Sequence, residues 1–171
     1  MKLDYKNILW FFGIIFIQIF FLDALDFGKL SSFFSPVIIS FFVLKQRLNT
    51  SMFQLLISAF FLGIIIDIFR NSLGLNTAII LLVAYLKPTF LYFISSNEDF
   101  EKELELNMFN IGIVRFLMFF GVSIFFYHQL FFLLEQFSFQ NFFSLFLKSL
   151  INTIVALLFL IFLQYIFIYK K

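Results

Sequence analysis

The sequence has no cysteine, a single histidine and little charge, and each shortage removes a class of function. The absence of cysteine excludes disulfide frameworks, thiolate metal sites and a cysteine nucleophile. One histidine, His128, cannot build a multi-histidine metal centre. Charged residues make up 13% of the chain and the net charge is +2, which is too little for a nucleic-acid-binding surface. The six glycines form no phosphate-binding loop. We therefore expect no enzyme, no cofactor, no metal and no nucleic-acid partner.

The chain is instead rich in long apolar stretches. Of its 171 residues 63% are hydrophobic and 33 are phenylalanine, and the mean hydropathy is +1.04. A helix crosses the hydrocarbon core of a bilayer with about 20 apolar residues, so the composition predicts an all-α integral membrane protein, folded as one transmembrane domain over residues 1–171. We expect six spans, at about residues 8–25, 32–44, 52–69, 73–94, 108–127 and 143–165. The second of these is short for a crossing and carries Pro36 near its start.

A polar segment separates the fourth and fifth predicted spans. Residues 96–107 begin with a helix-capping pattern, a serine followed three residues later by an acid. Phe100, Leu104 and Met108 repeat every four residues, so one face is apolar. We predict an amphipathic helix on the cytoplasmic surface. Its acids would be repelled by anionic lipid, so a basic protein surface is the expected partner. The residues expected to make that contact are Phe100, Glu101, Glu103, Leu104 and Glu105.

The distribution of lysine and arginine predicts the orientation, because these residues are retained on the cytoplasmic side. With six spans and both termini in the cytoplasm, most of the basic residues outside the spans fall on the inner side. The inner set is Lys2, Lys6, Lys45, Arg47, Lys102, Lys170 and Lys171, and the outer set is Lys29, Arg70 and Lys148. Lys87 and Arg115 lie within spans near their inner ends, where we expect them to snorkel towards the headgroups. An ion pair with an acid of residues 98–105 is the alternative for Arg115.

Asp67 is the sharpest polar candidate, since ionisable groups inside a bilayer are costly. It lies four residues after Gly63, so a small residue and the carboxylate share one helix face, which favours close approach of a second helix. Arg70 and Asn71 lie within one turn and are expected to pair with it. We interpret Asp67 as a structural residue that satisfies turn amides before Gly74, and such a role predicts tolerance of Asp67→Asn. A proton or substrate site is the alternative.

Three further polar residues lie within predicted spans. Gln18, Asn76 and Asn152 are expected to form hydrogen bonds between helices, worth roughly 0.6 kcal/mol each. A serine, histidine and aspartate arrangement could be assembled around His128, but no spacing in the sequence points to it. The polar residues therefore favour helix packing over catalysis.

Residues 61–86 carry an ordered set of features. A span ends in Gly-x-x-x-Asp, a short polar turn and a Leu-Gly pair follow, and the next apolar span has a tyrosine near its end. This order resembles the signature of the rod shape-determining protein MreD family. The matching residues are Gly63, Asp67, Leu73, Gly74 and Tyr85, with Arg70 in the turn between them. The chain departs from the family in its phenylalanine content and in its acidic segment 98–105.

The resemblance implies a non-enzymatic scaffold of the bacterial inner membrane that supports lateral peptidoglycan synthesis and rod shape. Its implied partners are MreC and, through MreC, the filament protein MreB, the polymerase RodA and a class B penicillin-binding transpeptidase. The implied fold is similar to the substrate-binding subunits of ECF transporters, and such a vitamin-transporter subunit is the alternative function. Those subunits typically pack their first helix through an Ala-x-x-x-Ala motif. Here residues 8–25 hold only Gly13 and Ala24 as small residues, which disfavours the transporter.

Overall fold

The computed structural model describes residues 5–24, 33–94, 104–136 and 141–168. In these ranges every regular element is a helix and there is no strand. Four helices are long and apolar enough to cross a membrane: α3 (Met52–Arg70), α4 (Leu75–Ile94), α6 (Ile113–Gln136) and α7 (Phe142–Phe167). The all-helical prediction is therefore confirmed for the described residues, and four of the predicted spans are helices long and apolar enough to cross a membrane.

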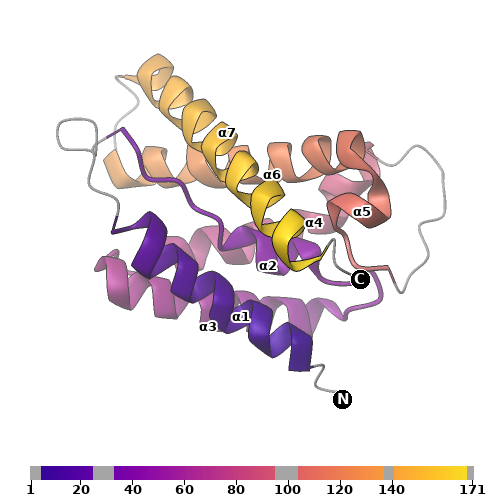
Figure 1. Ribbon diagram of the computed structural model, residues 1–171. Helices are drawn as coiled ribbons and strands as arrows, with labels where there is room; N and C mark the ends of the chain where they lie inside the picture. The colour runs from indigo at the N-terminus through magenta and orange to yellow at the C-terminus, as the bar shows by residue number, and fades with distance from the viewer. Residues whose placement is uncertain (1–4, 25–32, 95–103, 137–140, 169–171) are drawn as a thin grey trace.

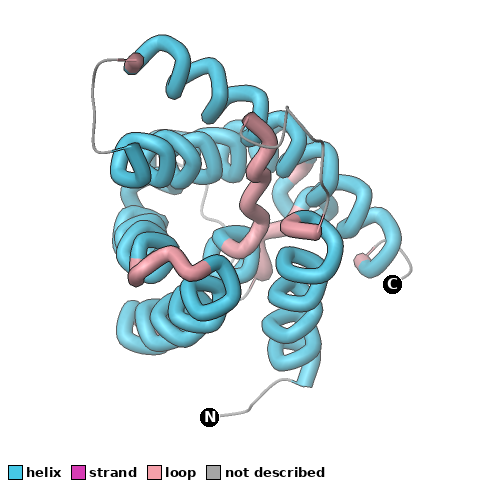
Figure 2. The backbone as a smooth tube through the Cα atoms, turned by 90° about the vertical axis from the view of Figure 1, so that its left-hand side faces the viewer, coloured by secondary structure: helices cyan, strands magenta, loops and turns pink. Residues whose placement is uncertain are grey.

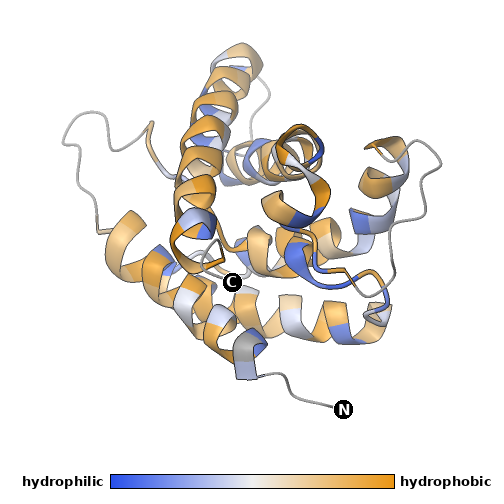
Figure 3. Ribbon diagram, turned by 45° about the vertical axis from the view of Figure 1, so that its right-hand side comes forward, coloured by the Kyte–Doolittle hydropathy of each residue, from blue (hydrophilic) through white to orange (hydrophobic). Residues whose placement is uncertain are grey.

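The long helices pack in chain order, α3 against α4, α4 against α6 and α6 against α7 (Figure 1). Their buried faces carry the core, and large apolar side chains stay exposed on the outer faces of all four. Figure 3 shows this apolar character along the whole length of the helices. Such extensive exposed apolar surface is unfavourable in water and suits a lipid environment.

The first predicted span is a helix that changes its winding before it ends. α1 (Tyr5–Ile17) continues directly into a π-helical turn, η1 (Gln18–Leu22). A π turn inserts an extra residue into the helical ladder and redirects the side chains around it. Gln18, the first residue of this π turn, is fully buried. The turn therefore faces an amide towards the protein interior.

The second predicted span is not a helix over most of its length, which corrects the expectation for residues 32–44. Residues 34–38 have no regular secondary structure, and α2 (Ser40–Lys45) is a short helix. Pro36 lacks a backbone N–H, and a proline disfavours helical geometry in the residue before it. Every residue of α2 is buried, and α2 contacts α1, α3, α4 and α6. Figure 2 shows the non-helical stretch, in pink, running between the surrounding helices.

The fifth span also departs from its predicted bounds of 108–127. A single helical turn, α5 (Met108–Ile111), is separated from α6 by Gly112, whose φ of +81° favours glycine. α6 then continues to Gln136, nine residues beyond the predicted end of the span at residue 127. Of the predicted amphipathic helix 96–107, residues 104–107 are non-helical, and the rest lies outside the described residues.

Candidate functional site

The turn between α3 and α4 reverses the chain within four residues. Asn71 ends α3 in the left-handed conformation with φ +53°, and its backbone N–H bonds back to the Asp67 carbonyl. Leu73 and Gly74 also have positive φ, +49° and +88°. Glycine adopts such angles without steric cost, whereas a leucine is strained there. The turn thus returns α4 directly against the end of α3.

The Asp67 carboxylate holds the start of α4. One oxygen, Oδ1, accepts hydrogen bonds from Ser72 Oγ at 2.5 Å and from the backbone and side-chain nitrogens of Asn76, each at 3.0 Å. The other, Oδ2, accepts from the Thr77 backbone N–H at 2.9 Å and from Thr77 Oγ1 at 2.5 Å. The first N–H groups of a helix lack partners within the helix, and an anion stabilises them. Asp67 therefore acts as a cap on α4 supplied by α3.

One turn before Asp67, Gly63 lets the two helices touch. A Cβ placed on Gly63 would lie 2.5 Å from the Thr77 Cα and 2.9 Å from Thr77 Oγ1. The first of these is a backbone atom, so a larger side chain would force α3 and α4 apart. This close approach brings the Thr77 donors within reach of Asp67. We name the set Gly63, Asp67, Ser72, Gly74, Asn76 and Thr77 the α3–α4 corner.

The corner is tied to a third helix through Tyr127 of α6. The Tyr127 hydroxyl donates a hydrogen bond of 2.5 Å to Asn76 Oδ1, and both groups are fully buried. Asn76 Nδ2 also donates to Ser72 Oγ at 2.8 Å. Both polar atoms of the Asn76 side chain are thereby hydrogen-bonded, and this one residue links α3, α4 and α6.

Arg70 does not pair with Asp67, which corrects the expectation from their spacing. Its Nε donates to Asp23 Oδ2 at 2.8 Å, and its Nη2 donates to Asp23 Oδ1. Asp23 Oδ1 also accepts from Gln18 Nε2 at 2.8 Å. The Asp67 oxygens are occupied by the amides and hydroxyls of α4, so the guanidinium binds the carboxylate that follows η1. This ion pair joins the end of α3 to the end of the first span.

Two residues of the family-like signature lie outside the corner. Leu73 is 98% exposed at the tip of the turn, and Tyr85 is 62% exposed on α4. Ser72, Thr77 and Tyr127 were not predicted as members of the network. A signal existed for two of them, since Ser72 precedes α4 and Thr77 lies in its first turn, and polar residues at these positions are typical of a capped helix end.

A second polar cluster surrounds the non-helical segment 33–39. Gln18 Nε2 donates to the Pro36 carbonyl at 3.1 Å, and Gln18 Oε1 accepts from the Ile38 N–H at 2.8 Å. His128 Nε2 accepts from the Val37 N–H at 3.0 Å. Because Nε2 is an acceptor, the ring proton is on Nδ1, which lies 3.0 Å from the Ile124 carbonyl.

Asn152 of α7 completes this cluster. Its Oδ1 accepts from the Ser35 N–H at 2.7 Å, and its Nδ2 donates to the Phe33 carbonyl at 2.8 Å. Non-helical backbone within a membrane is tolerated only where protein groups satisfy its N–H and C=O groups. Side chains from three different helices supply those partners here. The buried polar residues Gln18, His128 and Asn152 are therefore accounted for by the backbone that they bind.

Two lysines at the opposite end of the bundle, Lys45 and Lys87, are also buried in the protein. Lys87 does not snorkel: it is buried, and its Nζ donates to the carbonyls of Val43 at 3.3 Å and Gln46 at 2.6 Å, which caps α2. Lys45 Nζ forms an ion pair with Glu105 at 3.1 Å. Arg115 is exposed at the start of α6.

The expected partner-contact residues are only partly visible in this arrangement. Glu105 is engaged by Lys45 within the chain, and the Leu106 N–H donates to the Lys45 carbonyl at 3.1 Å. Leu104 is half-buried beside them. Phe100, Glu101 and Glu103 lie outside the described residues. Residues 104–107 thus pack as an extended strap across the end of α2.

The polar side chains of the two clusters bind backbone groups of neighbouring segments. Among the described residues, no three histidine, cysteine, aspartate or glutamate side chains form a group that could hold a metal ion. The described residues thus form an all-helical protein in which four helices are long and apolar enough to span a membrane. Comparison with protein-family models, with curated proteins and with solved structures gave no match.

Proposed function

We propose that this protein is a non-enzymatic scaffold of the bacterial inner membrane, of the MreD type, within the complex that drives lateral peptidoglycan synthesis. MreC is its direct partner, and MreB, RodA and a class B penicillin-binding transpeptidase are reached through MreC. The proposal rests on the resemblance of residues 61–86, and one structural observation carries it. Both oxygens of Asp67 accept hydrogen bonds from residues 72–77.

A carboxylate that works in proton transfer or substrate binding needs an oxygen that can exchange its partner. Asp67 is instead surrounded by five short bonds, two of them from backbone N–H groups that cannot move away without opening α4. Asp67, the one acid in residues 61–86, therefore joins α3 to α4 in a helix hairpin. A rigid hairpin with exposed apolar faces suits a protein whose function is to bind other membrane proteins.

Six crossings with both termini in the cytoplasm belong to the same proposal. As a helix, residues 33–45 would cover about 20 Å, at about 1.5 Å per residue. With the first half extended, at about 3.3 Å per residue, the same chain reaches about 30 Å, the thickness of the hydrocarbon core. Two pockets support a crossing: Ser35 lines one pocket with Arg70, at one end of α3, and Gln46 lines another with Gln54, near the other end. The non-helical segment then serves as the second span.

Affinity purification of the tagged full chain from its host membranes in a mild detergent tests the proposal. We expect MreC to co-elute, together with RodA and the transpeptidase. Gly63→Leu, which separates α3 from α4, should abolish this co-elution. Gly13→Leu is the matched control, because a Cβ at Gly13 meets no atom within 4 Å. Co-elution of an ATPase and a transport subunit instead would support the ECF-type vitamin transporter.

A further inference from the structure

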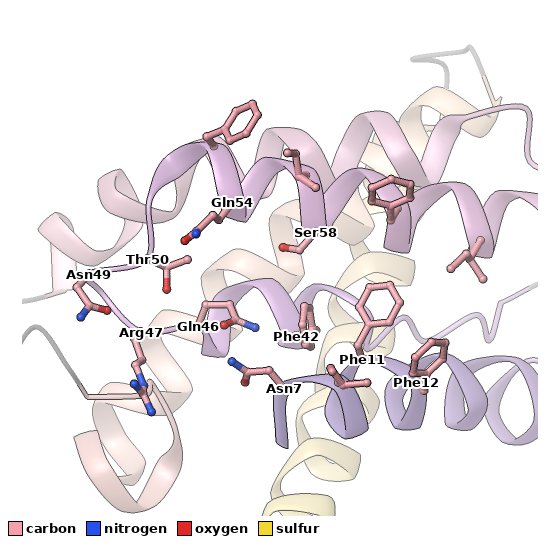
Figure 4. A pocket seen from close by; sticks show the side chains of 15 residues that line it. Asn7, Phe11, Phe12, Phe42, Gln46, Arg47, Asn49, Thr50, Gln54 and Ser58 are labelled. Atoms are coloured by element: carbon pink, nitrogen blue, oxygen red, sulfur yellow. The ribbon is translucent and has the colours of Figure 1, made fainter. Parts of the chain in front are cut away.

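A groove opens between α1 and α3, with α2 as its floor (Figure 4). It has a volume of about 1040 Å³. α1 and α3 are therefore separated on this side by a space much larger than a single side chain, and the space lies on the outer surface of the bundle.

The lining of the groove changes from polar to apolar along its length. The polar side chains gather at the end where α2 ends and α3 begins, as Figure 4 shows. They are Asn7, Gln46, Arg47, Asn49, Thr50 and Gln54. Arg47 brings a positive charge to this end, and the amide and hydroxyl side chains beside it are hydrogen-bond donors. The amino-terminal end of α3 opens at the same place, and its peptide dipoles add positive potential there. The polar end is thus suited to an anionic group.

Beyond this end the walls are aromatic and aliphatic. The apolar lining comes from α1, α2 and α3, and includes Phe11, Phe12, Phe42, Ile57, Phe61 and Ile65. Ser58 is the one polar side chain between them, and its hydroxyl donates to the Leu55 carbonyl at 2.8 Å, so it presents no free donor to the groove. A ligand that matches this gradient has an anionic head and an apolar tail.

The length of the groove distinguishes a lipid from a partner helix. Along α3 the lining extends from Phe53 to Ile65, which is about 18 Å at about 1.5 Å per residue. One leaflet of the hydrocarbon core is about 15 Å thick. A transmembrane helix of a partner would cross both leaflets and would need an apolar groove along the full helix. The length of the lining along α3 is therefore closer to the thickness of one leaflet than to that of the whole hydrocarbon core.

We propose that this groove is a binding site for one anionic phospholipid of the adjoining leaflet, with the phosphate at Arg47 and the neighbouring amides and an acyl chain between α1 and α3. Under the orientation inferred above this is the cytoplasmic leaflet. Lipid binding in this groove requires no particular partner protein, so a failure of the scaffold function would not contradict the lipid site.

Native mass spectrometry of the full chain, released from nanodiscs of phosphatidylglycerol and phosphatidylethanolamine in a ratio of one to three, tests the site. We expect one phosphatidylglycerol to remain bound after the surrounding lipid has been removed. Arg47→Gln should reduce its retention about tenfold, the loss expected for a charge-assisted hydrogen bond. Arg115→Gln, which removes an exposed arginine elsewhere, should leave retention unchanged.

A filling variant tests the apolar half. Ser58→Phe places a ring between α1 and α3 and should abolish retention of either lipid, whereas Ile68→Phe, on the exposed outer face of α3, should not. Equal retention in Arg47→Gln, Ser58→Phe and the unmodified chain would overturn the proposal, and so would the absence of retained lipid. A photoreactive residue at position 61 should form adducts with lipid. Adducts with a protein there would assign the groove to a partner helix and contradict the lipid site.

Discussion

Thr77 lies against Gly63 so closely that a Cβ on Gly63 would come within 2.5 Å of the Thr77 Cα. This contact fixes the distance between α3 and α4, and it is the reason that Asp67 reaches the first amides of α4. The corner is therefore sensitive to the addition of a single methyl group.

Gly63→Ala should destabilise the protein by roughly 1–3 kcal/mol, because the new methyl meets backbone and overpacked interfaces cost about this much. Thermal unfolding in detergent measures the effect. Gly13→Ala is the control: its Cβ meets nothing within 4 Å, and alanine has the higher helix propensity. Equal melting temperatures for the two variants would show that α3 and α4 are not in contact at Gly63.

The ion pair of Asp23 with Arg70 should be measurable as a coupling energy. The side chains are 23% and 12% exposed, and the contact is bidentate. A double-mutant cycle with Asp23→Asn and Arg70→Gln should give a coupling of about 1–3 kcal/mol, as expected for neighbouring charged groups in one network. The same cycle between Asp67 and Arg70 should give a smaller value. A larger coupling energy between Asp67 and Arg70 than between Asp23 and Arg70 would instead support the Asp67–Arg70 pair that the sequence spacing predicted.

The non-helical segment depends on His128. Substituting His128 with phenylalanine leaves the Val37 N–H buried without its acceptor, which should cost about 1–3 kcal/mol in unfolding free energy. Gln129→Leu is a neighbouring control. The buried side-chain atoms of Gln129 have no hydrogen-bond partner among the described residues, so its replacement should be neutral or stabilising. A larger loss at position 129 than at position 128 would contradict the assigned role of His128.

Reporter fusions can test whether residues 33–45 cross the membrane. Reporter fusions after Arg47 and Lys171 should be active in the cytoplasm, and a fusion after Asn71 should be active outside it. If the non-helical segment does not cross, residues 45–51 remain outside the cytoplasm and the turn at residues 71–74 lies inside it. Periplasmic activity after Arg47 would then be observed, and the six-span topology would be wrong.

Long apolar runs and small-residue spacing were sufficient to predict the four long helices, and Gly63 pointed to a close helix contact. The non-helical backbone of residues 34–38 could not be predicted, because its hydrogen-bond partners lie far away in the sequence. Asn152 and Ser35 are separated by 117 positions, and His128 and Val37 by 91. Pro36 was the local signal that a continuous helix was unfavourable.

The partner of Arg70 was predicted incorrectly for a related reason. Spacing along one helix favours Asp67 as its partner, but the turn brings the free amides of α4 to that carboxylate first. Asp23, 47 positions earlier, then takes the guanidinium. Pairing across a chain reversal depends on the turn geometry, and the left-handed residues Asn71 and Leu73 give no clear indication of it in the sequence.

The expected effect of Asp67→Asn also changes once the contacts are known. Both oxygens accept from backbone N–H groups, so an asparagine amide would present its NH₂ to a donor whichever way it is turned. We therefore expect Asp67→Asn to lower the free energy of unfolding by roughly 2–4 kcal/mol instead of being tolerated. One buried N–H donor would lose its acceptor, and the start of α4 would lose the negative charge that Asp67 places beside it.

The relation between cell shape and the amount of folded protein tests the proposed scaffold role, and the structural role of the corner in it, most directly. Asp67→Asn, Gly63→Ala and Thr77→Val are each used to complement a depletion strain, and cell width is compared with the amount of folded, MreC-bound protein in the membrane. A structural Asp67 predicts that all three variants fall on one curve, with shape lost only as folded protein is lost. Round cells that contain normal amounts of the assembled Asp67→Asn complex would contradict this account.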